Sequence, residues 1–133
     1  EYAASLGTDL GYQNFRDELA SLPGKYARPN GRLYLALVGG VPAGCVAMRR
    51  LDGSRAEMKR LYVRDSFRGL SLGRTLAQRV IADARSAGFS ELVLDTLASM
   101  HRAQALYRSL GFVETTAYYN CPVAGTVFMR LTL

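Results

Sequence analysis

Apolar and polar positions along this chain change from a helical to a strand-like spacing. Apolar residues recur at loosely helical intervals between Leu6 and Leu22, and this pattern ends at Pro23-Gly24. Three short apolar runs follow, at 33–38, 41–51 and 56–63. Glycine-containing dipeptides that favour turns separate these runs. The pattern therefore predicts one or two helical pieces and then three strands in an antiparallel meander.

The second half of the chain alternates between helix and strand signals. Leu72, Leu76, Val80 and Ala84 recur at every fourth position, which predicts a helix over 72–87 with its apolar stripe toward the core. A strand that follows such a helix should lie parallel to the strand before it. The other expected elements are a left-handed cap at Gly88, a strand at 91–96, a helix at 100–110 capped by Ser99 and ended by Gly111, and closing strands at 112–119 and 126–131.

These elements describe an α/β fold with a mixed sheet, and the length of 133 residues suits one domain spanning 1–133. No apolar run approaches the roughly 18 residues of a membrane span. One histidine and the two cysteines, Cys45 and Cys121, cannot complete a zinc site of normal spacing. We expect both thiols to be free, which favours a reducing, cytoplasmic setting, with no metal and no membrane partner.

The net charge of +6 has a local origin in the sequence. Residues 49–85 hold ten basic and four acidic side chains, whereas the chain on either side is balanced. Such an excess indicates a compact polyanionic ligand or a solvated basic face. A nucleic-acid binder is less consistent with the pattern, because the aromatic residues are not interleaved with the basic ones.

The stretch from Val63 to Leu76 carries the strongest chemical signal. A β-branched strand runs into a basic, glycine-containing turn, and the turn leads directly into the helix at 72–87. This construction directs free backbone N–H groups and the positive end of the helix dipole at one point, where phosphate binds well. Neither the Walker pattern nor the dinucleotide pattern Gly-x-Gly-x-x-Gly occurs in the chain.

The segment Arg68-Gly69-Leu70-Ser71-Leu72-Gly73 resembles the signature of the GNAT superfamily of acetyl-CoA-dependent N-acetyltransferases, Arg/Gln-x-x-Gly-x-Gly/Ala. The strand at 57–63 resembles the central strand of that family, and 105–112 resembles its second motif. The resemblance implies a GNAT-like fold, with one parallel pair of strands splayed at the cofactor site. It also implies that the family's first strand is missing here, lying upstream or supplied by another chain.

The resemblance further implies acetyl-CoA as the acetyl donor. The diphosphate is expected on the backbone amides of 68–73, and the pantetheine arm along the backbone of 61–63. Arg68 and Arg74 are candidate phosphate partners or ordinary surface arginines. The residues expected to hold the donor are Leu61, Tyr62, Val63, Arg68, Gly69, Leu70, Ser71, Leu72, Gly73 and Arg74. Met100 stands where many relatives carry Asn.

Ser71 occupies the position of the first glycine in the motif. A serine with φ > 0 would be strained, whereas a negative φ would accommodate it and leave its hydroxyl free to donate to a phosphate. We expect the second arrangement.

Acetyl transfer to an amine needs a group for the leaving thiolate and a route for the amine proton. The resemblance points to Tyr107 for the thiolate, although its helical spacing also suits a core aromatic. Glu57, on the same strand face as Lys59, is the candidate base, or else a plain ion-paired residue. Tyr118, Tyr119 and Asn120 line either the acceptor pocket or a hairpin turn. A covalent route through Cys45 lacks a neighbouring base.

These observations predict an N-acetyltransferase acting on a primary amine by direct attack. The alternative is a catalytically silent acyl-CoA sensor of the same fold. The sequence leaves the acceptor open, from peptide amines to polyamines and small amino compounds. A homodimer is compatible with the family.

Overall fold

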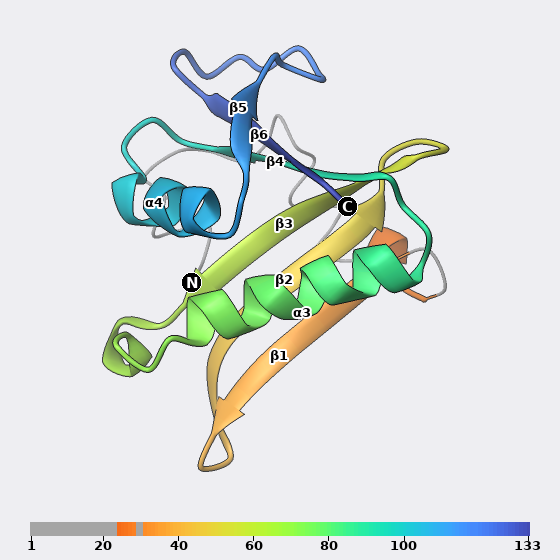
Figure 1. The fold of residues 1–133 in the computed structure, drawn as a ribbon. Helices are drawn as coiled ribbons and strands as arrows, with labels where there is room; N and C mark the ends of the chain where they lie inside the picture. Colours follow the sequence, from red (N-terminus) through yellow and green to blue (C-terminus); the bar gives the residue numbers. More distant parts are fainter. Residues whose placement is uncertain (1–23, 29–30) are drawn as a thin grey trace.

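The computed structural model describes residues 24–28 and 31–133, so the helical pieces expected between Leu6 and Leu22 lie outside the described residues. Six strands form one sheet in the order β1-β2-β3-β4-β6-β5 (Figure 1). The expected mixed sheet is confirmed. Two short 3₁₀ turns, η2 (Gly24–Tyr26) and η3 (Asp65–Phe67), precede β1 and follow β3.

The predicted meander is confirmed almost to the residue. Strands β1 (Arg32–Val38), β2 (Val41–Arg50) and β3 (Arg55–Val63) pair antiparallel in sequence order. Gly39 and Gly40 both have positive φ, which the tight turn between β1 and β2 requires. This meander forms the half of the sheet that ends at the central strand β3.

The parallel pair is short, and its shortness creates an opening in the sheet. Strand β4 (Glu91–Thr96) pairs with β3 only from Arg55–Glu91 to Glu57–Val93. Beyond Glu57 the two strands separate, and β4 continues its pairing with β6 (Val127–Thr132) on its other side. The sheet is therefore splayed between the C-terminal halves of β3 and β4.

The strand expected at 112–119 is much shorter in the structure. Strand β5 covers only Val113–Thr115 and pairs with β6. The chain then leaves the ladder because Tyr118 and Tyr119 turn over one face of the sheet and donate hydrogen bonds to Glu57 and Asp95. The two tyrosines that made 112–119 resemble a strand therefore serve as side-chain anchors and not in strand pairing.

Helices α3 (Leu72–Ser86) and α4 (His101–Ser109) cover the same face of the sheet (Figure 1). The core lies between them and the strands. Its members include residues from α3, from β2–β4 and β6, and around the end of α4: Val46, Met48, Ala56, Met58, Leu76, Val80, Ile81, Leu92, Leu94, Tyr107, Phe112, Met129 and Leu131. The predicted apolar stripe of the first helix is confirmed by its buried residues.

Glycines end both helices as predicted. Gly88 and Gly111 have positive φ, and the amides that follow them bond back into the last helical turn, from Phe89 N–H to Ala84 O and from Phe112 N–H to Tyr107 O. This is the Schellman arrangement. The expectation that Ser99 caps α4 is wrong. Met100 is the N-cap residue, without a side-chain cap, because a tight turn bonds the Met100 amide to the Leu97 carbonyl.

A β-bulge at Arg60 changes the direction of side chains along β3. Arg60 has φ of 61°, and the register with β2 gains one residue between Lys59 and Tyr62. Before the bulge, Met58 faces the core; after it, Leu61 and Val63 pack against the same core. The bulge therefore places three core-facing side chains of β3 beside the splay.

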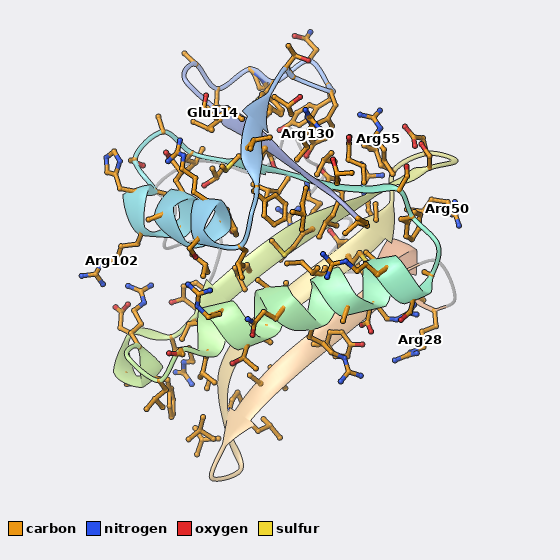
Figure 2. The ribbon with its side chains drawn as sticks, viewed as in Figure 1. Arg28, Arg50, Arg55, Arg102, Glu114 and Arg130 are labelled. Atoms are coloured by element: carbon orange, nitrogen blue, oxygen red, sulfur yellow. The ribbon has the colours of Figure 1, made fainter. Side chains whose placement is uncertain are left out.

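The sequence cluster of positive charge is dispersed in space. Arg50 and Arg55 lie at the turn between β2 and β3, far along the strand from Val63, and Arg55 pairs with Asp52 (Figure 2). Arg79 pairs with Asp83 on α3. The positive excess of residues 49–85 therefore does not gather around the glycine-containing turn, and part of it belongs to a solvated basic face. Within residues 24–28 and 31–133, no helix has the length and apolarity that crossing a membrane requires.

Gly44 on β2 offers a test of how tightly the central strand is held. A Cβ added to Gly44 would lie 2.6 Å from the carbonyl oxygen of Tyr62, a backbone atom that cannot move without shifting β3. We expect Gly44→Ala to lower the free energy of unfolding by about 1–3 kcal/mol in urea denaturation. Gly53→Ala, at a turn with nothing within 4 Å, is the matched control and should change it by less than about 0.5 kcal/mol. Equal effects would contradict this account.

Candidate active site

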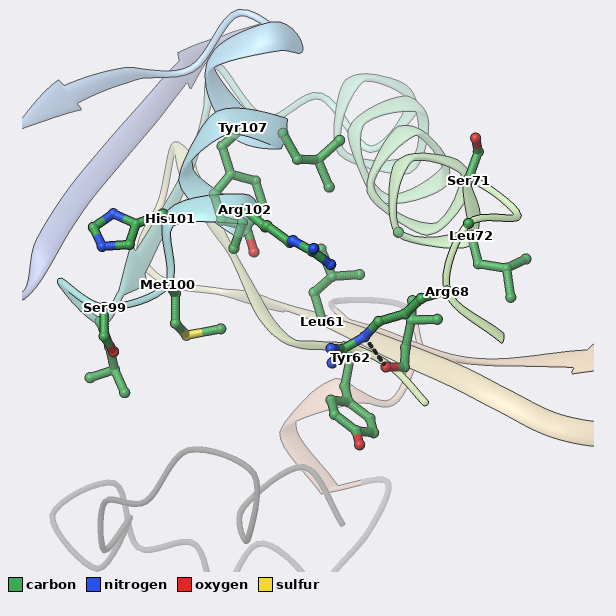
Figure 3. Close-up of a pocket in the computed structure, with 16 residues that line it drawn as sticks. Leu61, Tyr62, Arg68, Ser71, Leu72, Ser99, Met100, His101, Arg102 and Tyr107 are labelled. Carbon is green, nitrogen blue, oxygen red and sulfur yellow. Dashed lines mark hydrogen bonds between the residues drawn. The ribbon is translucent and has the colours of Figure 1, made fainter. Parts of the chain in front are cut away.

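An open groove of about 740 Å³ lies at the splay of the sheet (Figure 3). Its walls come from the end of β3, from the turn at 68–73 and from the segment that leads into α4, including Leu61, Arg68, Ser71, Met100 and Tyr107. The volume falls within the range of small-molecule sites. The splay predicted from the family resemblance therefore coincides with a groove.

The start of α3 faces this groove with unsatisfied amides. The first intrahelical bond runs from the Thr75 amide to the Ser71 carbonyl. The amides of Leu72, Gly73 and Arg74 precede that bond and have no helical acceptor. Together with the positive end of the helix dipole, they form a site suited to phosphate oxygens.

Ser71 adopts the arrangement that we did not expect. It is the N-cap residue of α3 with φ of 60° and ψ of 25°, in the left-handed region. The expectation of a negative φ is therefore wrong. The turn reverses the chain between η3 and α3 at this residue, and the reversal explains why a glycine fits the family motif here. Ser71 acts as the N-cap through its backbone carbonyl, which accepts hydrogen bonds from both the amide and the hydroxyl of Thr75.

The structure brings most of the predicted donor-binding residues together. All except Leu70 and Arg74 line the groove. Leu70 is an exposed apolar side chain, and the Arg74 guanidinium donates to Ser109 Oγ on α4 at 2.7 Å. Arg68 lines the groove, donates to the Val63 carbonyl and pairs with Asp65.

Two basic residues of the groove were not predicted. His101 and Arg102 stand in the first turn of α4 and line the groove opposite β3, and Figure 3 shows the Arg102 side chain extending toward the side where Arg68 lies. Cations are unfavourable at a helix N-terminus, and the first turns of α3 and α4 contain no acidic residue. The positive ends of both helix dipoles therefore face the groove without a carboxylate in the first turn, and Arg102 adds a further positive charge there.

Tyr107 borders the groove from α4. Its ring is buried at 6% exposure and packs against Phe112 with centroids 5.8 Å apart. The Schellman bond to its carbonyl fixes the same residue through the backbone. Tyr107 is therefore a core aromatic that also lines the groove, and its place in the core does not exclude a role in the groove.

Glu57 lies on the opposite face of the sheet, at the last paired position before the splay. It is 1% exposed, and both of its oxygens are engaged. Arg49 Nε donates to Oε1 at 2.7 Å, and the Tyr118 hydroxyl donates to Oε2 at 2.5 Å. Lys59 Nζ lies 4.0 Å from Oε2, which confirms the shared strand face. Glu57 is thus a buried, ion-paired carboxylate beside the opening.

Tyr118 and Tyr119 form an aromatic cluster with Phe128 on this face. Tyr119 donates to Asp95 on β4, as Tyr118 does to Glu57 on β3. Burial, together with the neighbouring carboxylates, raises the pKa of both phenols, so they remain protonated donors at neutral pH. Two carboxylates therefore flank the splay, each held by a tyrosine from the loop between β5 and β6.

Comparisons with known proteins agree with this geometry. Residues 5–112 match the model of the Acetyltransferase (GNAT) family. An uncharacterised N-acetyltransferase of Schizosaccharomyces pombe is 43% identical over 100% of this chain and 83% of its own length, and one of Dictyostelium discoideum is 31% identical over 100% and 90%. A crystal structure of an acetyltransferase from Streptococcus agalactiae has a TM-score of 0.80 at 26% identity, covering 98% of this chain and 82% of that one.

The chain belongs to the GNAT acetyltransferase family. It is an acetyl-CoA-dependent N-acetyltransferase, as the sequence predicted. A GNAT acetyltransferase from Elizabethkingia anophelis, solved with acetyl-CoA bound, shares the fold with a TM-score of 0.72 at 22% identity, covering 96% of this chain and 87% of that one.

Substitutions at Ser71 test the strain at the start of α3. A left-handed conformation costs an L-residue roughly 1–2 kcal/mol, and more if it is β-branched. Glycine avoids this cost but loses roughly 0.5–1 kcal/mol through its flexibility in the unfolded chain. We expect the free energy of unfolding, measured by urea denaturation, to be highest for Ser71→Gly, lower for the unmodified protein and lowest for Ser71→Val. A Ser71→Val variant as stable as the unmodified protein would contradict the left-handed geometry.

Arg102→Ala tests the basic wall of the groove. Loss of one charge-assisted contact to a phosphate should weaken CoA binding roughly tenfold in isothermal titration, because such contacts contribute about 1.5–3 kcal/mol. The loss should shrink at high salt. Arg108→Ala removes an arginine of the same helix that pairs with Glu114 outside the groove, and it should leave the Kd unchanged. A similar loss in both variants would indicate a general charge effect.

Proposed function

We propose that acetyl-CoA lies in the groove with its diphosphate on the amides at the start of α3 and its acetyl end toward Tyr107. The observation that carries this proposal is the coincidence of the two features in one groove, free amides at one wall and a buried tyrosine at the other. Arg68 and Arg102 supply positive charge along the same path. The residues present therefore fit a polyanionic donor with an apolar arm.

The open edge of β3 supports the position of the arm. The ladder between β3 and β4 ends at Glu57–Val93, so the backbone of 61–63 borders the groove, and among the described strands none pairs with it on that side. An extended amide chain can pair with such an edge as an added strand does. The pantetheine arm of acetyl-CoA is an extended amide chain of this kind.

Tyr107 is the proposed partner of the leaving thiolate. Bound acetyl-CoA supplies an activated thioester, and its sulfur departs as a thiolate that needs a proton or a hydrogen bond. A phenol with an ordinary pKa near 10 can supply either to a thiolate whose conjugate acid has a pKa near 8.5. The ring packing against Phe112 holds the side chain in place for this role.

Glu57 is the proposed base for the amine, which enters from the face opposite α3 and α4. Its place at the end of the β3–β4 pairing supports this role, because the splay begins at that residue. Direct attack by the amine is favoured over a covalent route. The Cys45 thiol donates to the Arg60 carbonyl at 3.3 Å, and burial raises its pKa, so it is a poor nucleophile.

Two broader features of the sequence complete the proposal. Cys45 and Cys121 are free thiols, which is consistent with a reducing, cytoplasmic setting. A homodimer could bury the outward-facing side chains of β1, where Leu33, Leu35 and Leu37 are exposed.

The direct test of the proposed function combines binding and turnover. Acetyl-CoA should bind the purified protein, and the protein should release free thiol when an acceptor amine is added. Free amino acids, spermidine and a short peptide with a free N-terminus form the panel, and thiol release is followed spectrophotometrically. Binding without release from any member would contradict the proposed role in amine acetylation.

Tyr107→Phe tests the thiolate partner. The substitution keeps the ring and its packing against Phe112 but removes the hydroxyl, so the Kd for CoA should stay within about twofold. The value of kcat should fall roughly a hundredfold, in the lower range of general acid catalysis. Stopped-flow or steady-state thiol release with saturating acetyl-CoA gives the measurement. An unchanged kcat would restrict Tyr107 to a structural role.

A further inference from the structure

The proposed base cannot reach an amine by itself in this structure. Glu57 is 1% exposed, with Oε1 held by Arg49 and Oε2 held by Tyr118. The carboxylate therefore has no exposed oxygen to offer to a substrate that enters the splay. A proton that leaves the amine needs an intermediate carrier, either water or one of the groups bound to Glu57.

Tyr118 is the partner of Glu57 with the chemistry of a proton carrier. A phenol hydroxyl donates one hydrogen bond and accepts others, whereas the guanidinium of Arg49 and the ammonium of Lys59 have no lone pair to accept a proton. Tyr118 donates to Glu57 Oε2 at 2.5 Å, so its oxygen retains acceptor capacity. The residue is also only partly buried, in contrast to Glu57.

The surroundings of Tyr118 hold its hydroxyl at the splay. Its ring packs edge-on against Phe128 at 5.3 Å and against Tyr119 at 5.5 Å. Phe128 is on β6, paired with Asp95 of β4, so the loop that carries Tyr118 is anchored across the splay from β3. The hydroxyl is fixed beside the last paired residue of the parallel strands.

We propose that Tyr118 accepts the proton of the acceptor amine and passes its own proton to Glu57, so that these two residues act as one relay. This inference rests on the proposed function and assigns a catalytic role to a residue of the loop at 116–126. The role of Arg49 is to hold the receiving carboxylate in place. Burial and the neighbouring carboxylates raise the pKa of Tyr118, so the phenol carries its proton before each transfer.

The step balances in atoms and charge. The amine nitrogen forms a bond to the acetyl carbonyl carbon, and the C–S bond breaks with its electron pair on sulfur, which takes the proton of the Tyr107 hydroxyl. The nitrogen loses one proton to Tyr118 Oη while the Tyr118 proton moves to Glu57 Oε2. Glu57 later returns its proton to solvent, and Tyr107 regains one.

The test uses Tyr118→Phe in the full chain, with acetyl-CoA and the fastest acceptor among free amino acids, spermidine and a short peptide. We expect kcat to fall roughly a hundredfold while the KM for acetyl-CoA stays within about twofold. Glu57→Gln should show a similar loss, and the double variant no further loss. Tyr118→His, whose ring can also transfer a proton, should retain at least about tenfold more activity than the Phe variant.

Tyr34→Phe is the matched control. Tyr34 also donates its phenol proton to a carboxylate, Asp83 of α3, but it sits on β1 away from the groove. This variant should keep the kcat of the unmodified protein. Melting temperatures of both Phe variants separate loss of folding from loss of chemistry.

Recovery of activity in Tyr118→His distinguishes the relay from a structural contact, because the imidazole can transfer a proton whereas the benzyl ring of Tyr118→Phe cannot. The charged and titratable groups near Glu57 are Arg49 of β2, Lys59 of β3, Tyr118 of the loop and, beyond Tyr118, the Asp95–Tyr119 pair. Arg49, Lys59 and the Asp95–Tyr119 pair are the same in Tyr118→Phe and Tyr118→His, so a difference in kcat between these two variants reports on proton transfer at position 118.

Two outcomes would overturn the proposal, and they differ from each other. An active parent protein with a Tyr118→Phe variant within threefold in kcat would contradict only the relay and would assign the transfer to water. A parent protein that binds acetyl-CoA but acetylates no amine would contradict the proposed function and the relay with it.

Discussion

The early end of the β3–β4 pairing is the constraint on which the rest of this structure depends. Three residue pairs join the two parallel strands, and beyond Glu57 and Val93 each strand follows a different neighbour. A continuous sheet would leave no passage between its faces, because paired strands lie about 4.8 Å apart. In the proposed mechanism, the splay lets Tyr107 on one face and Glu57 on the other act on the same reaction.

Backbone strain gathers around this opening. Two residues other than glycine have positive φ in the described part of the chain: Arg60, in the bulge of β3 next to the groove residue Leu61, and Ser71, which lines the groove at the start of α3. The bulge turns Leu61 and Val63 toward the core. The turn at Ser71 directs the helix amides at the same space. Such strain persists only where the surrounding structure fixes it, and the tightly packed core beneath the groove provides that support.

The sequence predicted the elements that hydrophobic periodicity governs and missed those that single side chains govern. Strand and helix bounds from 32 to 109 agreed within about a residue. The spacing of Leu76 and Val80 fixes which face of the helix is buried, and that of Leu92 and Leu94 does the same for the strand. The conformation of Ser71, the cap of α4 and the short β5 followed from local hydrogen bonds that no spacing rule encodes. Arg102 was not predicted as a groove residue, although the expected helix start at 100 already placed this cation in the first turn. Glu57 was a candidate from its strand position, but its partner Tyr118 lies 61 residues away and only the fold joins them.

The link between the two helices beside the groove has a mechanical consequence. Arg74 of α3 donates to Ser109 Oγ of α4, and the space beside Gly73 is closed by Leu106, 3.5 Å from where a Cβ would stand. The turn at 68–73, where the diphosphate is proposed to bind, is thus linked directly to the helix that carries Tyr107. Because the two helices are already held together, binding of the donor should cost little free energy for rearranging the protein. Any movement that the donor causes in α3 should be accompanied by movement of α4.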